Sequence, residues 1–294
     1  MYSSFTMPID PWPQQMNDYK KGEEVGSGNF ATVYRGSLAS DPSKKCALKV
    51  IKLSDIDEKS RALQQQELGF LRDLAHKNIV QAYTSFFVDL KTYVLVMEDM
   101  GDQDLEAYVR HELLSEYRLI PEYRIWRYLT QIADALTFVH SKNVLHRDLK
   151  TSNILKSGSL IKVGDFGLSK RVKPGGKYTE RCGTPFYLAP ERMGKKAYGF
   201  PSDVWSLGCI FYEMCTGVSP YFGERSNEYS LRTKIVHSDC PPISEDCYSF
   251  FVEDLIASML QKDPAYRPDA AFVAAYARKI DNYYRTKFPD LPDI

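Results

Sequence analysis

The sequence predicts an α+β fold in which a smaller strand-rich part precedes a larger helical part. Residues 19–53 mix apolar and basic positions in an extended pattern, and Thr92–Met97 is an apolar run with the length of a buried strand. From Leu105 onward the apolar residues recur every three or four positions, as they do in helices that bury one face. We expect helices over residues 122–141, 202–217, 249–260 and 269–284.

The strand-rich part also contains one expected helix, over residues 59–75, where apolar residues and Glu67 recur at helical spacing. The change to the helical part falls near residues 98–103. Residues 1–18 are rich in proline and show little periodicity, so they predict a loose leader. Residues 1–13 lack the basic and apolar segments of a signal peptide.

Charge and cysteine content narrow the classes of function. The 294 residues include 38 lysines and arginines and 38 aspartates and glutamates, so the formal net charge is zero. A neutral chain does not favour a general binder of nucleic acid or of membrane surfaces, and no apolar run has bilayer-spanning length. The 6 cysteines form no C-x-x-C pair. They predict reduced thiols, several of them in the core, and a cytoplasmic protein, with the nucleus or cytoskeleton as alternatives.

A glycine-containing segment, Val25–Val33, lies early in the strand-rich part. Gly26 and Gly28 would let the backbone approach phosphate groups closely, but a simple hairpin turn explains the pattern as well. In a dinucleotide-binding fold these glycines would open a helix. The residues after Ala31 are β-branched and aromatic instead, so we expect a second strand.

More specific signals occur in His146–Asn153 and in Asp165–Gly167. Phosphoryl transfer requires a carboxylate that holds the incoming hydroxyl, together with metal ligands that carry hard oxygen atoms. Asp148 and Asn153 supply such groups on one short loop. A predicted hairpin over residues 154–163 would bring Asp165 alongside them.

These motifs, in this order, resemble the protein kinase superfamily from about Tyr19 to Tyr284. The resemblance implies a bilobal protein kinase fold over residues 19–288, with an N-lobe of about 19–97, a hinge of about 98–101 and a C-lobe of about 102–288. It also implies ATP with Mg²⁺, or Mn²⁺ in its place, as cofactors. The implied partners are proteins bearing serine or threonine, not nucleic acids or membranes; the sequence makes no prediction of oligomeric state.

The resemblance assigns roles residue by residue. Asp148 is implied as the catalytic aspartate, Asn153 and Asp165 as metal ligands, and Lys49 as the phosphate-binding lysine that pairs with Glu67. The other positions implied to bind ATP are Val25, Gly26, Ser27, Gly28, Asn29, Val33, Ala47, Met97, Glu98, Met100 and Leu155. Phe166, His146 and Leu71 are similar to the stacked column that registers the active state of the family.

Lys150 and Thr184 favour serine/threonine over tyrosine specificity. A lysine two positions after Asp148 is typical of serine/threonine kinases, where it neutralises charge on the transferred phosphate. Thr184 resembles the residue that hydrogen-bonds both this aspartate and this lysine.

Other segments are similar to the NIMA-related kinases. Gly164 directly before Asp165 and the run Pro241–Ile243 fit that branch, whereas Thr151 and Ser152 depart from the more usual residues of the loop. Glu191 and Arg267 are implied to form a buried ion pair.

Regulation is predicted at Arg147, which in the family is neutralised by an activation-loop phosphate. Glu180 lies three positions before Gly183, where a threonine commonly sits, so we hypothesise that its carboxylate replaces that phosphate. Phosphorylation of Thr179 after a one-residue shift is an equal alternative. For the whole chain, the alternative functions are a catalytically weak scaffold on the kinase fold and a regulatory ATP-binding module.

Overall fold

The computed structural model describes residues 12–28, 31–53, 73–101, 103–173, 178–180, 182–194, 197–223 and 228–292. The chain divides into two compact units, each of which is described by itself. Unit 1 comprises residues up to Ala75 together with Val80–Asp99, and unit 2 comprises His76–Ile79 and Met100–Ile294. The division after Asp99 falls within residues 98–101, the segment expected as a hinge.

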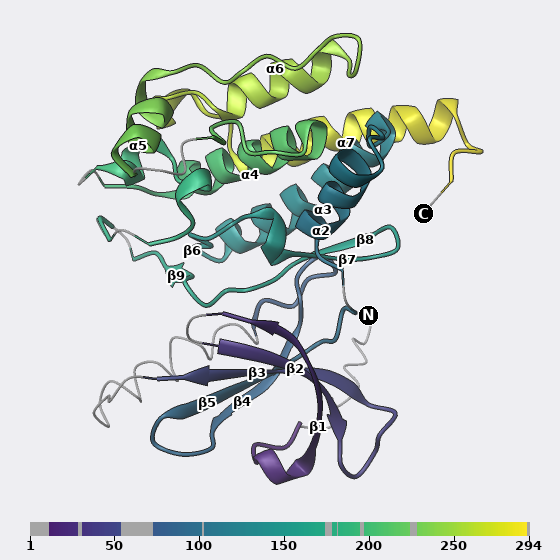
Figure 1. The fold of residues 1–294 in the computed structure, drawn as a ribbon, viewed down its shortest axis with the longest axis vertical. Coiled ribbons are helices and arrows are strands. Elements are labelled where there is room, and N and C mark those ends of the chain that lie inside the picture. The colour runs from purple at the N-terminus through teal and green to yellow at the C-terminus, as the bar shows by residue number, and fades with distance from the viewer. Residues whose placement is uncertain are drawn as a thin grey trace, which may run out of the picture. The chain divides into compact units, whose positions relative to one another are not determined.

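Unit 1 is built on a five-stranded sheet in which each strand pairs antiparallel with its neighbours (Figure 1). In spatial order its strands are β1 (Tyr19–Ser27), β2 (Ala31–Leu38), β3 (Lys45–Lys52), β5 (Thr92–Met97) and β4 (Ala82–Phe87). The strands expected within residues 19–53 and at 92–97 are therefore confirmed. The sequence analysis missed β4, because four of its six residues are buried and its pattern does not alternate.

The chain before β1 packs against the sheet. Trp12 stacks on Tyr83 with ring centroids 4.3 Å apart, and the hydroxyl of Tyr19 donates to the carbonyl of Pro13 at 2.6 Å. A short 3-10 helix, Met16–Asp18, then leads into β1. Residues 12–18 thus differ from the loose leader that the sequence predicted, because an aromatic side chain anchors them on the core of unit 1.

Unit 2 is mainly helical. Its helices are α2 (Leu105–Val109), which continues as the π-helix η3 (Arg110–Ser115), α3 (Glu122–Ser141), α4 (Phe200–Thr216), α5 (Glu228–His237), α6 (Phe250–Met259) and α7 (Ala270–Lys287). Its short strands pair as β6 (Val144–Leu145) with β9 (Lys170–Arg171), and β7 (Ile154–Ser157) with β8 (Leu160–Val163). Short 3-10 helices occur at Thr151–Asn153, Pro185–Tyr187, Pro190–Met193 and Pro264–Tyr266.

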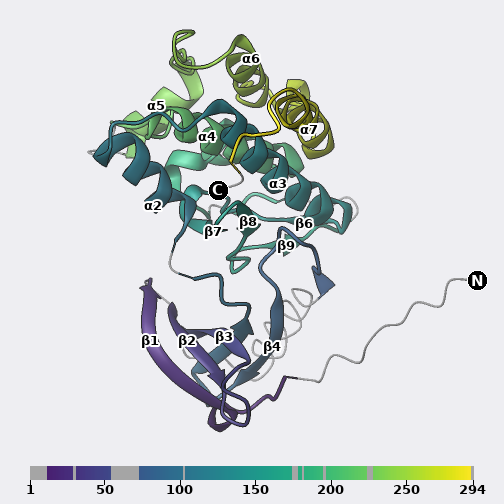
Figure 2. The ribbon, with the colours of Figure 1, turned by 90° about the vertical axis from the view of Figure 1, so that its right-hand side faces the viewer.

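The core of unit 2 forms around α4, which is buried from Ser202 to Cys215. Helix α3 buries one face and packs against α7, which runs beside it in Figure 2. All four helices expected in this part are present, within a few residues of their predicted ends. The sequence analysis missed α5, whose apolar residues form no clear helical stripe.

A buried ion pair links two loops of unit 2. Arg267 donates from both Nη atoms to the two carboxylate oxygens of Glu191, at 2.8 Å each, and both side chains are buried. The predicted pair is therefore confirmed. A buried ion pair adds little to the free energy of unfolding, because desolvation offsets the attraction between the charges. Removing one partner, however, leaves an unpaired buried charge and is strongly destabilising.

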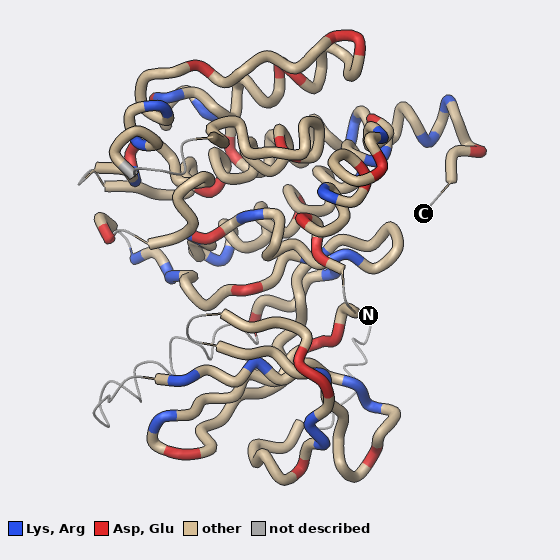
Figure 3. The backbone as a smooth tube through the Cα atoms, viewed as in Figure 1, with Lys and Arg blue, Asp and Glu red and all other residues tan. Residues whose placement is uncertain are grey.

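The six cysteines are free thiols, and Cys46, Cys209 and Cys215 are buried, as expected for core packing. Acidic and basic residues both occur in each unit along the described backbone, in keeping with the neutral composition (Figure 3). Within the described part of the chain, no helix combines the length and the apolar character needed to span a membrane.

Candidate active site

The loop that carries Asp148 leaves β6 and is fixed by a buried histidine. His146 is fully buried, its Nε2 lies 3.1 Å from the carbonyl of Gly164, and its ring packs 4.7 Å from that of Phe166. Burial lowers the pKa of His146, which favours the neutral ring. The two expected motifs of unit 2 are therefore brought together; Leu71, the third member of the expected column, lies outside the described residues.

Asp203, on α4, forms hydrogen bonds with the backbone of the same loop. Its Oδ2 accepts from the backbone N–H of His146 at 2.9 Å and lies 3.0 Å from Nε2 of His140, while Oδ1 accepts from the N–H of Arg147 at 3.0 Å. Burial opposes ionisation of this carboxyl, but the contact with His140 and the backbone donor keep the pKa of Asp203 below its usual value. The sequence analysis gave Asp203 no role, because its partners lie more than fifty positions away.

The backbone on either side of this contact is strained, including at Arg147, the residue before Asp148. Arg147 has a φ of 70° and Asp165 a φ of 49°, both in the left-handed region that non-glycine residues rarely adopt. Such strain persists only where the surroundings over-determine it, and it is concentrated at functional sites. Here the three hydrogen-bonded contacts of Asp203 supply the restraint at Arg147.

Asp148, Lys150 and Thr184 form one network. Oδ1 of Asp148 accepts from both the backbone N–H and the hydroxyl of Thr184, at 2.8 Å each. Nζ of Lys150 donates to Oγ1 of Thr184 at 3.1 Å and lies 3.4 Å from Oδ2 of Asp148. The contacts that the sequence predicted for Thr184 are present, and those at Oδ1 are shorter than the contacts of Lys150 and Asn153 with Oδ2, at 3.4 and 3.3 Å.

Asn153 and Asp165 lie close to this network. The side-chain amide of Asn153 donates to the carbonyl of Asp148 at 2.8 Å, and the N–H of Gly164 donates to the carbonyl of Asn153 at 2.8 Å. Gly164 is the residue before Asp165, so this backbone contact links Asn153 to the segment that carries Asp165. An amide oxygen and a carboxylate are hard ligands that suit Mg²⁺, which usually completes its shell with water and phosphate oxygens.

Among the described residues, no three His, Cys, Asp or Glu side chains gather into a group able to hold a metal by themselves.

Glu180 occupies the position in front of Arg147. Its Oε2 accepts from Nη1 of Arg147 at 2.5 Å, and its Oε1 accepts from Nζ of Lys170 at 2.6 Å. Hydrogen bonds from Lys170 and Arg147 lower the pKa of Glu180, so its carboxylate stays ionised. Thr179, the alternative regulatory residue, is exposed.

The segment that follows, residues 183–191, is fixed by a close backbone contact. Gly183 has a φ of 97°, and a Cβ at this position would lie 2.6 Å from the carbonyl oxygen of Arg147. The same carbonyl accepts from Nη1 of Arg192 at 2.8 Å, and Nη2 of Arg192 donates to the carbonyl of Cys182 at 2.6 Å. Sequence reasoning gave Arg192 no role.

A buried carboxyl ties this segment to the catalytic loop. The hydroxyl of Tyr187 donates to Oε2 of Glu213 at 2.6 Å, and the hydroxyl of Thr151 donates to Oε1 at 3.2 Å. The two hydroxyls lie 3.0 Å apart. Burial raises the pKa of Glu213 to about 7. The sequence analysis predicted neither the contact of Tyr187 with Glu213 nor that of Thr151. It noted Thr151 only as a departure from the family pattern.

The glycine-containing segment lies in unit 1. Val25, Gly26 and Ser27 end β1, and β2 begins at Ala31, so the predicted second strand is confirmed. A Cβ at Gly26 would meet none of the described atoms within 4 Å. Asn29 lies outside the described residues.

Register places the other expected residues of unit 1 on adjacent strands. Val33 pairs with Lys49, and Ala47 pairs with Met97. The N–H of Glu98 donates to the carbonyl of Gln81 at 2.9 Å. Glu67, the expected partner of Lys49, lies outside the described residues.

The last expected ATP-binding residues belong to unit 2. Met100 is buried, and Leu155 lies on β7, where it forms an isolated bridge with Asp104. Asp104 also caps α2, because its Oδ1 accepts from the N–H of Ala107 at 2.7 Å. No contact between Met100 and Leu155 is described.

A family model described as "Protein kinase domain" matches residues 19–276. The chain is 36% identical over 264 residues to serine/threonine-protein kinase Nek8 of Danio rerio, covering 89% of this chain and 37% of that relative. It is 33% identical over 258 residues to serine/threonine-protein kinase Nek11 of Homo sapiens, covering 86% of this chain and 39% of the relative. It is 34% identical over 259 residues to probable serine/threonine-protein kinase nek3 of Dictyostelium discoideum, covering 86% and 22% respectively.

These relatives confirm the resemblance to the NIMA-related (Nek) kinases that the sequence predicts. The chain spans less than half the length of each of them, so the comparison concerns the part that they share with it.

Proposed function

Because the chain belongs to the protein kinase domain family, we propose that it is a serine/threonine kinase that transfers the γ-phosphate of ATP to protein hydroxyls. The observation that carries this proposal is the network of Asp148, Lys150 and Thr184. It supplies a carboxylate fixed at one oxygen, with a cation 3.4 Å from the other. That arrangement suits a reaction whose catalysis consists mainly of positioning and charge stabilisation.

In this proposal Asp148 orients the incoming serine or threonine hydroxyl and accepts its proton at Oδ2. Thr184 holds Oδ1 with two donors, so the carboxylate cannot rotate away from its substrate. Lys150 neutralises negative charge that grows during transfer. Because Lys150 also donates to Thr184, its position depends on the same hydroxyl that restrains Asp148.

We assign Asn153 and Asp165 to Mg²⁺, or to Mn²⁺ in its place. When bound, such an ion neutralises charge on the phosphate oxygens. The assignment is supported by the oxygen-bearing side chains and by the backbone contact that joins Asn153 to Gly164, the residue before Asp165. The amide of Asn153 also donates to the carboxylate of Asp148 at 3.3 Å, so the same residue restrains the proposed base.

For ATP we assign the residues named from the family resemblance. In unit 1 these are Val25, Gly26, Ser27, Gly28, Asn29, Val33, Ala47, Lys49, Met97 and Glu98, with Glu67 as the partner of Lys49; in unit 2 they are Met100 and Leu155.

The assigned domain is residues 19–288, with an N-lobe of about 19–97, a hinge of about 98–101 and a C-lobe of about 102–288. We further propose protein substrates rather than nucleic acids, a NIMA-related specificity and a cytoplasmic location. The neutral composition supports protein substrates, the similarity to Nek kinases supports the specificity, and the free cysteines support the location.

We also propose that Glu180 supplies the negative charge that an activation-loop phosphate supplies elsewhere in the family. Its support is the pair of contacts with Arg147 and Lys170, which occupy both carboxylate oxygens. The competing assignment, phosphorylation of Thr179, is distinguished by the variants described in the Discussion.

The test of acceptor specificity uses radiolabelled ATP with three peptides that differ only in a serine, threonine or tyrosine acceptor. The proposal expects label on the serine and threonine peptides and none on the tyrosine peptide. A scaffold or a regulatory ATP-binding module would bind nucleotide without labelling any of them. Label on the tyrosine peptide alone would contradict the assignment of Lys150 and Thr184.

A further inference from the structure

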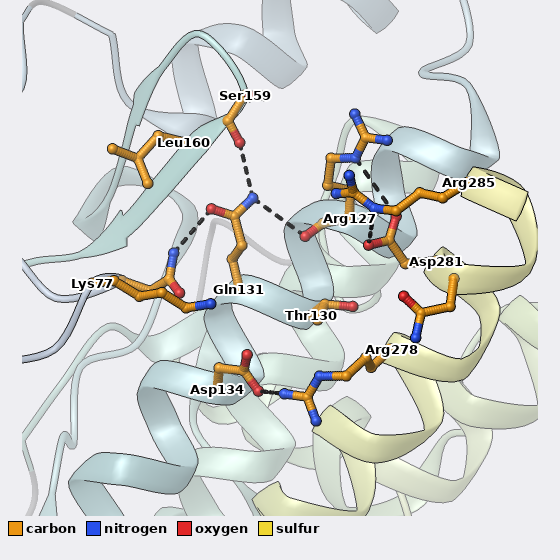
Figure 4. Close-up of a pocket in the computed structure, with 12 residues that line it drawn as sticks. Lys77, Arg127, Thr130, Gln131, Asp134, Ser159, Leu160, Arg278, Asp281 and Arg285 are labelled. Atoms are coloured by element: carbon orange, nitrogen blue, oxygen red, sulfur yellow. Dashed lines mark hydrogen bonds and ion pairs between the residues drawn. The ribbon is translucent and has the colours of Figure 1, made fainter. Parts of the chain in front are cut away.

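Unit 2 contains a surface pocket of about 430 Å³ that none of the residues assigned to catalysis lines (Figure 4). Helices α3 and α7 form two of its walls. The turn between β7 and β8, at Ser159 and Leu160, forms a third, and Lys77 and Asn78 complete the lining. The volume lies in the range of sites that bind small ligands or a few side chains.

The side-chain amide of Gln131 lines the pocket and is held by several hydrogen bonds. Oε1 of Gln131 accepts from Nδ2 of Asn78 and from the N–H of Ile161, at 2.9 Å each. Its Nε2 donates to the carbonyl of Ser159 at 2.9 Å. Gln131 thereby joins α3, the β7–β8 hairpin and the segment at Asn78, so the walls are held together before any ligand arrives (Figure 4).

The lining carries an excess of positive charge in a chain that is neutral overall. Its charged members are four basic side chains and two carboxylates: Lys77, Arg127, Arg278, Arg285, Asp134 and Asp281. This local imbalance favours an anionic ligand.

The two carboxylates each bind one arginine of α7 but leave other N–H donors of its guanidinium unused in the described contacts. Asp134 pairs with Nη2 of Arg278, and Oδ2 of Asp281 accepts from Nε of Arg285 at 2.9 Å. Each guanidinium has five N–H donors, and the described contacts use one in each of Arg278 and Arg285. Their side chains are 49% and 46% exposed, so the remaining donors are accessible in a restrained geometry.

The spacing of the arginines indicates a ligand with more than one anionic group. Arg278 and Arg285 lie two turns apart on α7, about 10 Å along the helix axis. One carboxylate or phosphate does not span that distance. A polypeptide in the polyproline II conformation does, because three residues complete one turn and advance about 9 Å, so two side chains three positions apart lie on the same face.

We propose that this pocket binds an acidic peptide segment of a protein partner, with two carboxylates three residues apart on Arg278 and Arg285 and with Lys77 as a third contact. A peptide is favoured over nucleic acid because Asp134 and Asp281 lie within the lining and would repel a continuous run of phosphates. The proposal concerns binding and does not depend on the catalytic assignment.

The test uses a fluorescein-labelled peptide with two glutamates three positions apart among glycines and serines, titrated by fluorescence polarisation at low ionic strength. A second peptide carries glutamines in place of both glutamates. Lys279 is exposed on α7 and does not line the pocket, so Lys279→Glu is a control that matches the charge change of Arg278→Glu and Arg285→Glu.

We expect saturable binding of the glutamate peptide that weakens about tenfold or more in Arg278→Glu, Arg285→Glu and Lys77→Glu, and changes less than about twofold in Lys279→Glu. Circular dichroism checks that each variant remains folded. Three results would overturn the proposal: equal affinity for the glutamine peptide, an equal loss in Lys279→Glu, or equally tight binding of a labelled oligouridine in the same assay.

Discussion

Oε2 of Glu180 lies 2.5 Å from Nη1 of Arg147, in direct contact with the residue that precedes Asp148. The arginine side chain is only 10% exposed, whereas that of Glu180 is 54% exposed. A cation so little exposed requires a nearby negative charge, because desolvation disfavours an unpaired one. The carboxylate of Glu180 supplies that charge without a modification, and Lys170 holds its other oxygen.

We therefore predict that Glu180→Gln lowers the rate of phosphotransfer about tenfold, through loss of a charge-assisted contact with Arg147. Thr179→Ala, which removes the hydroxyl and the methyl group of an exposed side chain, should leave the rate unchanged. Both rates are measured against wild type on protein that has been incubated with ATP and, in a parallel sample, on protein that has then been treated with phosphatase. A dead Thr179 variant beside an unaffected Glu180 variant would establish phosphorylation of Thr179 instead.

The buried pair of Glu191 and Arg267 predicts a large loss of stability when one charge is removed. Glu191→Gln leaves the Arg267 guanidinium buried without its anion, so we expect the free energy of unfolding to fall by about 3 kcal/mol or more. Urea denaturation measures the change. Arg110→Gln breaks an exposed pair with Glu106 and should cost less than about 1 kcal/mol. Equal losses in the two variants would contradict this account.

A side chain at Gly183 should disturb the backbone near Asp148 and lower activity. Gly183→Ala would place a Cβ 2.6 Å from the carbonyl of Arg147, at a φ of 97°. Because neither the strained backbone nor the carbonyl can move without disturbing Thr184 and Asp148, we expect phosphotransfer to fall about tenfold or more. Alanine at Gly158, an exposed turn residue whose Cβ would meet no described atom within 4 Å, is the matched positive-φ control. If both variants keep full activity, the contact at Gly183 has no functional weight.

Glu213 predicts a stability that falls as pH rises. Its folded pKa is raised to about 7 by burial, above the value of 4.5 of an unperturbed glutamate. Between these values the folded state holds a proton that the unfolded state has released. The stabilising effect of the neutral carboxyl is complete below the unfolded pKa and is lost as pH rises through the folded pKa.

The expected difference between pH 4.5 and pH 8 is on the order of 3 kcal/mol of unfolding free energy. Glu213→Gln keeps an acceptor for Tyr187 and Thr151 but does not titrate, so its stability should lack this component. Urea denaturation of both proteins at several pH values isolates the contribution of Glu213. Parallel pH profiles for the two proteins would show that Glu213 does not titrate in this range.

Much of the fold was predictable because its signals are local. Helix α3 has a long amphipathic pattern, and β5 is a short apolar run between polar residues, so both were found with their observed bounds. Strand β4 and helix α5 escaped, since neither has a periodic pattern that its own residues reveal. The packing of residues 12–18 also escaped, because it depends on Trp12 meeting Tyr83 on a distant strand.

The site divides in the same way. Asp148, Lys150, Asn153 and Asp165 stand in short motifs with fixed spacing, and a hydrogen bond between Thr184 and Asp148 followed from the family resemblance. Asp203, Arg192 and Glu213 act through contacts with residues remote in sequence, which no local pattern indicates.

The most direct test of the central claim is the rate of label transfer from radiolabelled ATP to a generic protein substrate, for wild type and Asp148→Asn. Asparagine retains an oxygen for Thr184, so the network around it is conserved while the base is lost. We predict transfer by the wild type and a rate about a hundredfold lower in the variant. Equal rates in the two proteins would contradict the assignment of Asp148 and the mechanism built on it.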